Sequence, residues 1–510
     1  MRMGRLALLG LGLVVAPVMA SQELPRPAEL ASAVSFWKRV FTTVNSDEGL
    51  IHDRRELDRV YDQIVVPEEL SRANQRKRWK AAKARIRTAL NALAAQSGGP
   101  RTREQKRIRA LFARDAKPGA FRVAAKRLRF QRGLSNRFRA GYERSGRWYH
   151  QIRAVLNEHD VPAEVAALPH VESSFRTNVI SHAWAVGLWQ FTRSTGGDYM
   201  RIDAIIDERR DGWRASEAAA ELLSDAYESL GDWGLAITAY NHGITGMRRA
   251  RKTVEGGSIA AIIASYDGPN FGFASRNFYP ALLAAADVDA NANKYFGDVN
   301  RRTPPTYVEV AVPDFTRMDA IVATLPVSRG ELRDLNPALR DPVWAGNKYV
   351  PAGYALRVPM ADPKAAQAVL KEVPLTARYA KQRPDRRHRV QAGQTLSGIA
   401  KRYGVSASAL ARANNLDDRD FLRQGQVLRL PGAGAQPQSL AAKRGAKRAV
   451  YTVQSGDTLS GIAHRHDVSL NTLTRLNGMD KADTLRPGQK LQIRDKTSLS
   501  QAESNDSGEG

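Results

Sequence analysis

The sequence predicts a multidomain, mainly helical protein that ends in two copies of a small βααβ unit. The chain has 510 residues, more than one ordinary domain contains. Apolar residues recur at three- and four-residue spacing from about residue 23 to residue 287, which is typical of helices. Residues 388–430 align without a gap with residues 451–493, and about half of the paired positions are identical.

The first twenty residues predict export. Arg2 and Arg5 precede an apolar run over 6–15, and small residues follow up to Ala20. This pattern is typical of a secretory signal over 1–20, and an uncleaved membrane anchor is the alternative. We therefore expect an exported protein of the periplasm or cell wall, beyond the reach of chromosomal DNA and cytoplasmic RNA.

The charge of the chain favours an acidic partner. Basic residues outnumber acidic ones by 78 to 52, a net charge of +26. Residues 101–150 alone hold sixteen basic and three acidic residues. Two interpretations of this stretch stay open: a solvated basic face, and a surface that faces an acidic polymer, a membrane or the wall. The chain has no cysteine, which excludes disulfides, cysteine-type zinc sites, a cysteine nucleophile and a lipoprotein anchor.

Composition divides the rest of the chain. Residues 307–312 alternate like a strand, and two stretches are rich in small, polar or basic residues, as linkers are. The expected parts are a basic helical region over 21–131, a helical domain over 132–287, a small module over 305–360, a linker over 376–387, the first repeat over 388–431, a linker over 432–449, the second repeat over 450–494 and a disordered tail over 495–510.

The capping and turn residues of each repeat predict a strand, two short helices and a second strand. Thr395 and Ser406 are placed to cap the two helices of the first copy, and Thr458 and Ser469 those of the second. The copies resemble the LysM domain, which binds polymers that contain N-acetylglucosamine. The resemblance implies a sugar groove in each copy, built from Gly393, Gln394, Thr395 and Gly425, and from Gly456, Asp457, Thr458 and Gly488.

The module over 305–360 resembles a third, degenerate LysM copy. It lacks the Gly-(Asp/Gln)-Thr-Leu element of the other two, so whether it binds glycan stays open.

Glu172 is the candidate catalytic residue. Leu168, Val171 and Phe175 form an apolar stripe beside it. Poor solvation raises the pKa of a carboxyl group and keeps it protonated near neutral pH, as a general acid requires. Taken alone, such a glutamate is more often a surface residue at a helix edge than a catalytic one.

Three ordered motifs surround Glu172. They are Ala-Leu-Pro-x-x-Glu-Ser-x-Phe from residue 167, Ser-x-Ala-x-Ala-x-Gly-Leu-Trp-Gln-Phe from 181 and Ala-Tyr-Asn-x-Gly from 239. They resemble the lysozyme-like lytic murein transglycosylases, nearest to the membrane-bound D type, which also carries LysM modules. The resemblance implies a lysozyme-like domain that acts on peptidoglycan glycan strands without a cofactor.

The resemblance also implies residue roles. Glu172 would protonate the bond between N-acetylmuramic acid and N-acetylglucosamine and then take a proton from the muramoyl 6-hydroxyl, leaving a 1,6-anhydro end. Ser181, Gln190, Tyr240 and Asn241 would contact or shape the sugar site. A water-using muramidase and a non-catalytic wall-binding scaffold remain the alternatives.

Several residues have structural interpretations. Trp184, Trp189 and Phe191 are expected to pack in the core. His170, His182 and His242 have no metal-site spacing, so no metal is expected. Residues 273–280 lack the Glu-Thr pair of many relatives, which leaves a substrate contact open there.

Overall fold

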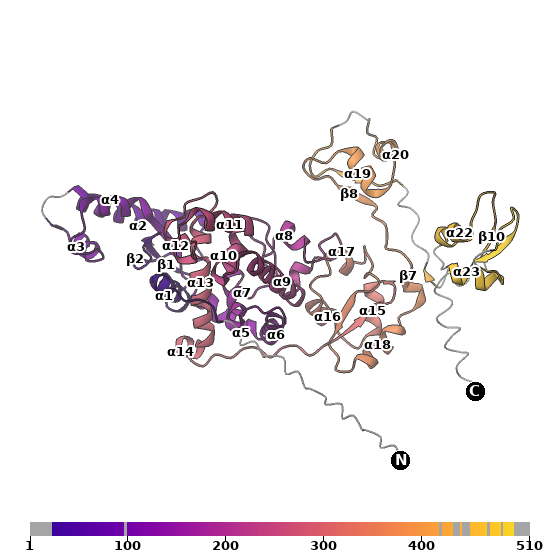
Figure 1. Ribbon diagram of the computed structural model, residues 1–510, viewed down its shortest axis with the longest axis horizontal. Coiled ribbons are helices and arrows are strands. Elements are labelled where there is room, and N and C mark those ends of the chain that lie inside the picture. The colour runs from indigo at the N-terminus through magenta and orange to yellow at the C-terminus, as the bar shows by residue number, and fades with distance from the viewer. Residues whose placement is uncertain are drawn as a thin grey trace, which may run out of the picture. The chain divides into compact units, whose positions relative to one another are not determined.

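The computed structural model describes residues 23–95, 99–417, 421–431, 439–440, 449–466, 470–480 and 483–493. The expected signal segment, the disordered tail and most of the 432–449 linker lie outside these residues. The chain forms two compact units (Figure 1), one of 23–307 with 333–340 and one of 308–332 with the chain from 341 onward. No helix in the described ranges is long and apolar enough to cross a membrane.

The first unit is mainly helical, with one small sheet. Its elements are η1 (Ala28–Leu30), α1 (Ala31–Thr42), β1 (Glu48–Asp53), β2 (Val60–Val65), α2 (Arg72–Ala95), α3 (Arg103–Arg109), α4 (Pro118–Arg127), β3 (Leu128–Arg132), α5 (Ser135–Ser145), α6 (Tyr149–Glu158), η2 (Ala163–Ala167), α7 (Leu168–Glu172), α8 (Arg193–Gly197), η3 (Glu208–Arg210), α9 (Gly212–Leu230), α10 (Trp233–His242), α11 (Ile244–Thr253), α12 (Ile259–Ser265), α13 (Phe273–Ala290) and α14 (Ala292–Phe296).

Helix α13 is the centre of the first unit (Figure 1). It is buried on nearly all sides, and it packs against α1, α10, η2 and α7. Phe41 of α1 and Leu282 of α13 belong to one continuous core. The boundary expected at 131/132 is therefore wrong, because the chain before it supplies part of the same core.

The helical N-terminal region also contains a small sheet that the sequence pattern did not predict. β1 lies between β2 and β3 in an antiparallel sheet, with Leu50 opposite Gln63 on one side and Gln131 on the other. These strands are five or six residues long and flanked by Ala- and Arg-rich helices, so helical periodicity dominates the surrounding sequence. A second core, which includes Ile86 and Phe121, joins α2, α3 and α4 to the sheet.

The second unit begins with a small αβ module. It contains β4 (Val308–Ala311), β5 (Phe315–Thr316), α15 (Met318–Thr324), α16 (Arg329–Leu335), α17 (Asp341–Trp344), β6 (Ala355–Val358), α18 (Pro363–Lys371), η4 (Leu375–Ala377) and β7 (Arg378–Tyr379). β4 and β6 pair antiparallel, with Val310 opposite Leu356.

The segment expected as a linker over 376–387 begins as packed structure. β7 pairs with β5, and the ring of Tyr379 stacks on Tyr349 at 4.2 Å. The polar and basic composition of this segment hid the strand, because the pairing comes from residues about sixty positions earlier in the chain.

The two repeats have the predicted βααβ fold. The first consists of β8 (Arg387–Arg389), α19 (Leu396–Tyr403), α20 (Ala407–Ala413) and β9 (Val427–Arg429), and the second of β10 (Ala449–Thr452), α22 (Leu459–Arg465), α23 (Leu470–Asn477) and β11 (Lys490–Ile493). Thr395, Ser406 and Thr458 cap their helices as predicted. The cap expected at Ser469 lies outside the described residues.

Candidate active site

Helix α7 carries Glu172 at its C-terminal end. Pro169 lies in the first turn, where a missing N–H costs nothing, so it helps to begin the helix. After Glu172 the chain turns sharply, with positive φ at Ser174 and Phe175. A five-residue helix has little stability of its own, so contacts with the rest of the unit must hold it in place.

Glu172 is an isolated acid in a poorly solvated place. Its side chain is partly buried, and the loss of hydration raises its pKa to about 8. This is the direction that its apolar neighbours predict. Near neutral pH the carboxyl group therefore holds its proton and can donate it.

His170 attaches α7 to α13. Its ring is buried, stacks on Phe138 with 3.9 Å between centroids, and places Nε2 2.9 Å from Asp289 Oδ1. Arg301 donates to the other oxygen of Asp289 at 2.7 Å. Burial opposes the ionised form of Asp289, but its partners His170 and Arg301 outweigh this and lower its pKa. His170 is therefore a hydrogen-bonded structural histidine two residues from Glu172.

The loop over 181–191 is bonded to three helices. Ser173, next to Glu172, donates to the Leu188 carbonyl at 2.8 Å. Tyr240 of α10 donates to the Trp189 carbonyl at 2.7 Å. The Trp189 indole donates to Ser216 of α9 at 2.8 Å. These bonds fix the loop beside the end of α7.

Tyr240 lies near Glu172. Burial raises the pKa of the Tyr240 hydroxyl well above its usual value, and the Glu172 carboxylate raises it further. Tyr240 thus stays a neutral hydrogen-bonding group at every working pH. The structure brings these two predicted residues together.

The side chains of Ser181 and Gln190 stabilise the loop itself. Ser181 Oγ accepts from the Ala185 N–H at 3.0 Å, and Gln190 Nε2 donates to the Gly187 carbonyl at 2.8 Å. Within the described residues, no hydrogen bond joins either side chain to Glu172. Asn241 is exposed, and its Oδ1 accepts from Ser275 of α13 at 2.8 Å.

The core placement expected of the three aromatic residues holds for two of them. Trp189 and Phe191 are core residues as expected, but Trp184 is 76% exposed, so its core placement is wrong. Trp184 has φ +62° in a tight turn, which directs its ring outward. The described residues contain no group of three or more potential metal ligands, and His182 is exposed while His242 packs on Phe271.

The predicted binding turn of the first LysM copy is held by its own side chains. Gly393 and Gly425 have φ of +76° and +89°, which glycine adopts without strain. Gln394 Oε1 accepts from the Gln391 N–H at 2.9 Å and lies 2.8 Å from His388 Nε2. Thr395 caps α19.

The second copy uses a charged version of this turn. Tyr451 replaces His388 and donates to Asp457 at 2.7 Å, and Arg465 bonds the other Asp457 oxygen at 2.9 Å. These hydrogen bonds lower the pKa of Asp457 to about 2. Gly456 and Gly488 again have positive φ, and Thr458 caps α22.

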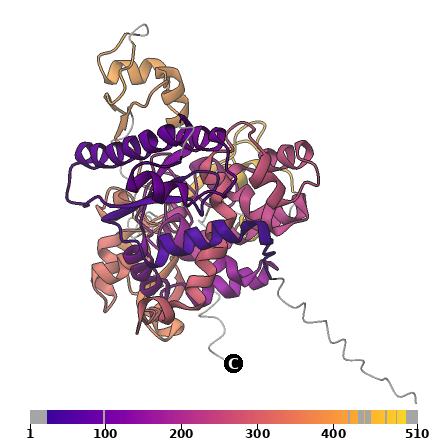
Figure 2. The same cartoon turned by 90° about the vertical axis from the view of Figure 1, so that its left-hand side faces the viewer.

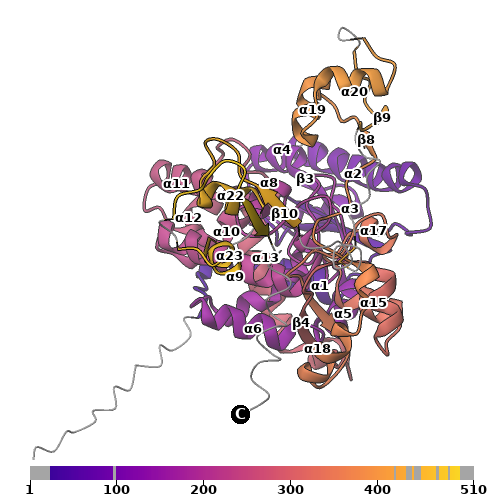
Figure 3. The same cartoon turned by 90° about the vertical axis from the view of Figure 1, so that its right-hand side faces the viewer.

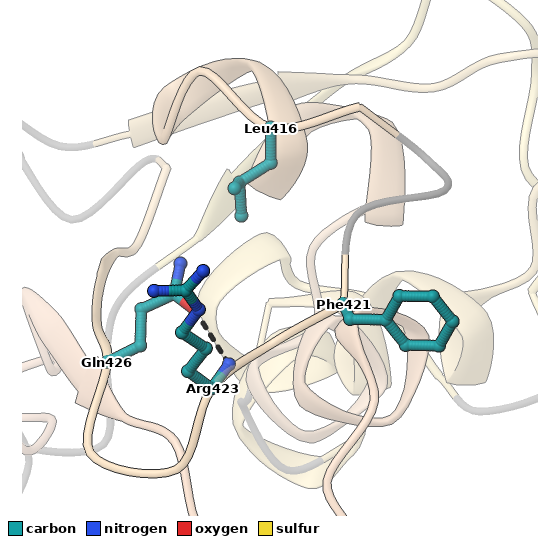
Figure 4. A pocket seen from close by; sticks show the side chains of 4 residues that line it. All are labelled: Leu416, Phe421, Arg423 and Gln426. Atoms are coloured by element: carbon teal, nitrogen blue, oxygen red, sulfur yellow. Dashed lines mark hydrogen bonds between the residues drawn. The ribbon is translucent and has the colours of Figure 1, made fainter.

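A pocket of about 550 Å³ lies in the first copy (Figure 4). Leu416, Phe421, Arg423 and Gln426 line it, and Gln426 accepts from the Arg423 N–H at 3.0 Å. The Phe421 ring points away from the other three side chains and is 97% exposed. The second copy has Thr484 at this position.

Replacing Glu172 with Gln is expected to stabilise the protein. A raised pKa means that the folded state keeps a proton that the unfolded chain loses, so the stability from this group is full below pH 4.5 and falls as the pH rises toward 8. Urea unfolding at pH 7 should show that Glu172→Gln raises the free energy of unfolding by about 2 kcal/mol. This is less than the full pKa shift implies, because the side chain keeps some solvent contact.

This gain should vanish at pH 4. Glu228→Gln, an exposed substitution on α9, is the control and should change stability little at either pH. An equal gain at both pH values would contradict the buried-acid account.

Gly187→Ala is expected to destabilise the loop. Gly187 has φ +85°, and an added Cβ would lie 1.8 Å from the Arg209 carbonyl oxygen. The backbone must shift to make room, so we expect the free energy of unfolding to fall by more than about 3 kcal/mol. Gly197→Ala, where a Cβ meets no atom within 4 Å, is the matched control for urea unfolding.

Comparison with known proteins finds two kinds of domain in the chain. The Transglycosylase SLT domain matches residues 151–263, and the LysM domain matches residues 388–431 and 451–494. The chain is 34% identical over 122 residues to N-acetylmuramoyl-L-alanine amidase sle1 of Staphylococcus aureus, covering 24% of this chain and 36% of that protein. A solved inactive mutant of lytic transglycosylase Slt from Pseudomonas aeruginosa is 17% identical, with a TM-score of 0.23, over 29% of this chain and 24% of that one.

A longer similarity extends over two thirds of the chain. Membrane-bound lytic murein transglycosylase D of Escherichia coli K12 is 30% identical over 359 residues, which are 67% of this chain and 75% of that protein. Together with the SLT and LysM matches, this extent shows that the chain belongs to the membrane-bound lytic murein transglycosylase D family.

Proposed function

We propose that Glu172 is the single acid and base of a peptidoglycan lytic transglycosylase. The chain is such an enzyme by its family and its SLT domain. The observation that carries the residue assignment is a lone, partly buried carboxyl group whose pKa is raised to about 8. It lies at the end of a helix that His170 joins to α13 and that Ser173 joins to the 181–191 loop.

The proposed reaction needs no water. Glu172 gives its proton to the oxygen between N-acetylmuramic acid and N-acetylglucosamine, and the bond from the muramoyl C1 to that oxygen breaks with its electron pair on the oxygen. The resulting Glu172 carboxylate removes the proton of the muramoyl 6-hydroxyl, whose oxygen then bonds to C1. The products are a 1,6-anhydro end and a free 4-hydroxyl, and Glu172 has regained its proton.

This chemistry explains why one carboxyl group suffices. Glycoside hydrolysis usually uses two carboxyl groups, one of which acts on water or on the sugar. Here the nucleophile is a hydroxyl of the substrate, already held close to the reacting carbon. We propose that Tyr240 lies against the reacting sugar and that Asn241, held by Ser275, shapes the adjoining turn.

The LysM modules bind peptidoglycan glycan and raise the local concentration of substrate. We propose that the protein works in the periplasm or at the cell wall after export. The proposed sugar contacts lie at the glycine turns, where Gln394 and Asp457 support the backbone.

Product analysis tests the reaction. Purified sacculi digested with the wild-type enzyme should yield 1,6-anhydro ends by mass spectrometry, whereas a water-using muramidase yields reducing ends. Glu172→Gln should lower the rate by about 10²–10⁴-fold or more, while Glu228→Gln should not. Activity retained by Glu172→Gln would refute the assignment, and an inactive wild type would favour a non-catalytic scaffold.

The pH dependence follows from the same group. The reaction begins with a protonated Glu172, so kcat/KM should be level below pH 8 and fall about tenfold per unit above it. Tyr240 titrates well above this range and should add no step there. Measuring initial rates on soluble glycan strands from pH 5 to 10 checks this expectation.

Phe421 is expected to strengthen glycan binding by the first LysM copy. An exposed aromatic ring offers an apolar face to a sugar, and Phe421→Ala should weaken binding of the full chain to chitooligosaccharides by about three- to tenfold. Thr484→Ala, at the matching position of the second copy, is the control. Equal effects of the two substitutions would assign no special role to the ring.

A further inference from the structure

Positive charge is concentrated in one segment of the chain. Residues 72–132 hold twenty basic and two acidic residues, a net charge of +18 out of +26 for the whole protein. Helix α2 contributes eight basic residues and no acidic one. The segment comprises α2, α3, α4 and β3, which we call the basic face.

The packing of these elements turns the cations outward. α2 and α4 lie side by side (Figures 1 and 3), and Ile86 and Leu90 of α2 share a core with Phe121 of α4. In Figure 2 the indigo helices of this end of the unit face the viewer. The exposed basic residues of the segment are Arg72, Arg76, Lys77, Arg78, Lys80, Arg85, Arg87, Arg101, Arg103, Lys106, Arg107, Arg114, Lys117, Arg122, Lys126 and Arg129.

Few acidic side chains of the described chain neutralise this face. Arg85 pairs with Asp62 and Glu104, and Arg107 lies 3.7 Å from Glu104. Burial, and then the neighbouring cations of Arg87, Arg129 and Lys80, lower the pKa of Lys83. Mutual repulsion of this kind opposes folding, and a bound polyanion relieves it.

The shape of the basic face favours an extended partner. Arg72, Arg76, Lys80, Lys83 and Arg87 follow one another at four- and three-residue spacing, so they form a stripe along α2. The 24 residues of α2 span about 36 Å. Val123 of α4 is 46% exposed among the cations, an apolar contact suited to a lipid surface.

We propose that the basic face docks onto an anionic phospholipid bilayer. A bilayer presents negative headgroups in one plane, so the stripe of cations along α2 can approach them together, and each basic residue near such a surface contributes about fivefold to the partition constant. This docking is independent of Glu172 and goes beyond the proposed reaction. It would hold the full chain at a membrane without a lipidated cysteine, which the sequence lacks.

Vesicle co-sedimentation tests the proposal. The full-length protein is mixed with vesicles of phosphatidylcholine alone or with 30% phosphatidylglycerol, at low and high salt. The wild type should sediment with the anionic vesicles at low salt but not with the neutral vesicles. High salt should release it from the anionic vesicles. Arg72→Glu/Arg76→Glu/Lys80→Glu should lower partition at least about a hundredfold.

The matched control changes net charge equally elsewhere. Lys364→Glu/Lys371→Glu/Lys381→Glu alters three exposed lysines of the second unit and should keep vesicle binding within about threefold. Circular dichroism and the anhydro-product assay identify a variant that has failed to fold. Glu172→Gln should bind vesicles like the wild type. Failure of the proposed reaction can therefore be distinguished from failure of the membrane docking.

Three outcomes would overturn the proposal. They are equal binding to neutral and anionic vesicles, full binding by the α2 triple variant, and a comparable loss in the control triple variant. If the α2 variant instead lost binding to purified sacculi alone, the carboxylates of the wall peptides would be the partner of the basic face.

Discussion

The contact between His170 and Asp289 determines where Glu172 lies. Helix α7 has five residues and forms too few internal hydrogen bonds to be stable alone. His170 joins it to the end of α13, and Arg301 holds Asp289 from the other side. Ser173 adds the bond to Leu188. The position of the acid is thus set by residues more than a hundred positions away in sequence.

The poor solvation of Glu172 favours its function but lowers the stability of the fold. Placing a carboxyl group where water solvates it poorly keeps a proton available for chemistry, but it disfavours the ionised form that the unfolded chain adopts at neutral pH. The surrounding core of α9, α10 and α13 compensates through buried apolar area. An enzyme built in this way accepts a less stable fold at one point in order to hold its reactive group ready.

Local patterns predicted much of the fold, and long-range contacts account for what they missed. The LysM repeat, its caps and the acid Glu172 are readable from residues close together in sequence. Strands β1–β3 were missed because their pairing joins Glu48–Asp53 to residues near 130. Asp289 and Arg301 carry no local signal, since only the fold brings them to His170. Trp184 was misplaced because hydrophobicity predicts burial, whereas its backbone turn decides the direction of the ring.

The two LysM copies stabilise one turn with different chemistry. In the first copy His388 bonds Tyr403 and Gln394, with no carboxylate among the three, whereas in the second Arg465 and Tyr451 hold an ionised Asp457. High ionic strength weakens an exposed ion pair more than a hydrogen bond that joins no opposite charges. A rise in salt should therefore loosen the turn of the second module more than that of the first, so the two modules of one chain need not lose their affinity for glycan together.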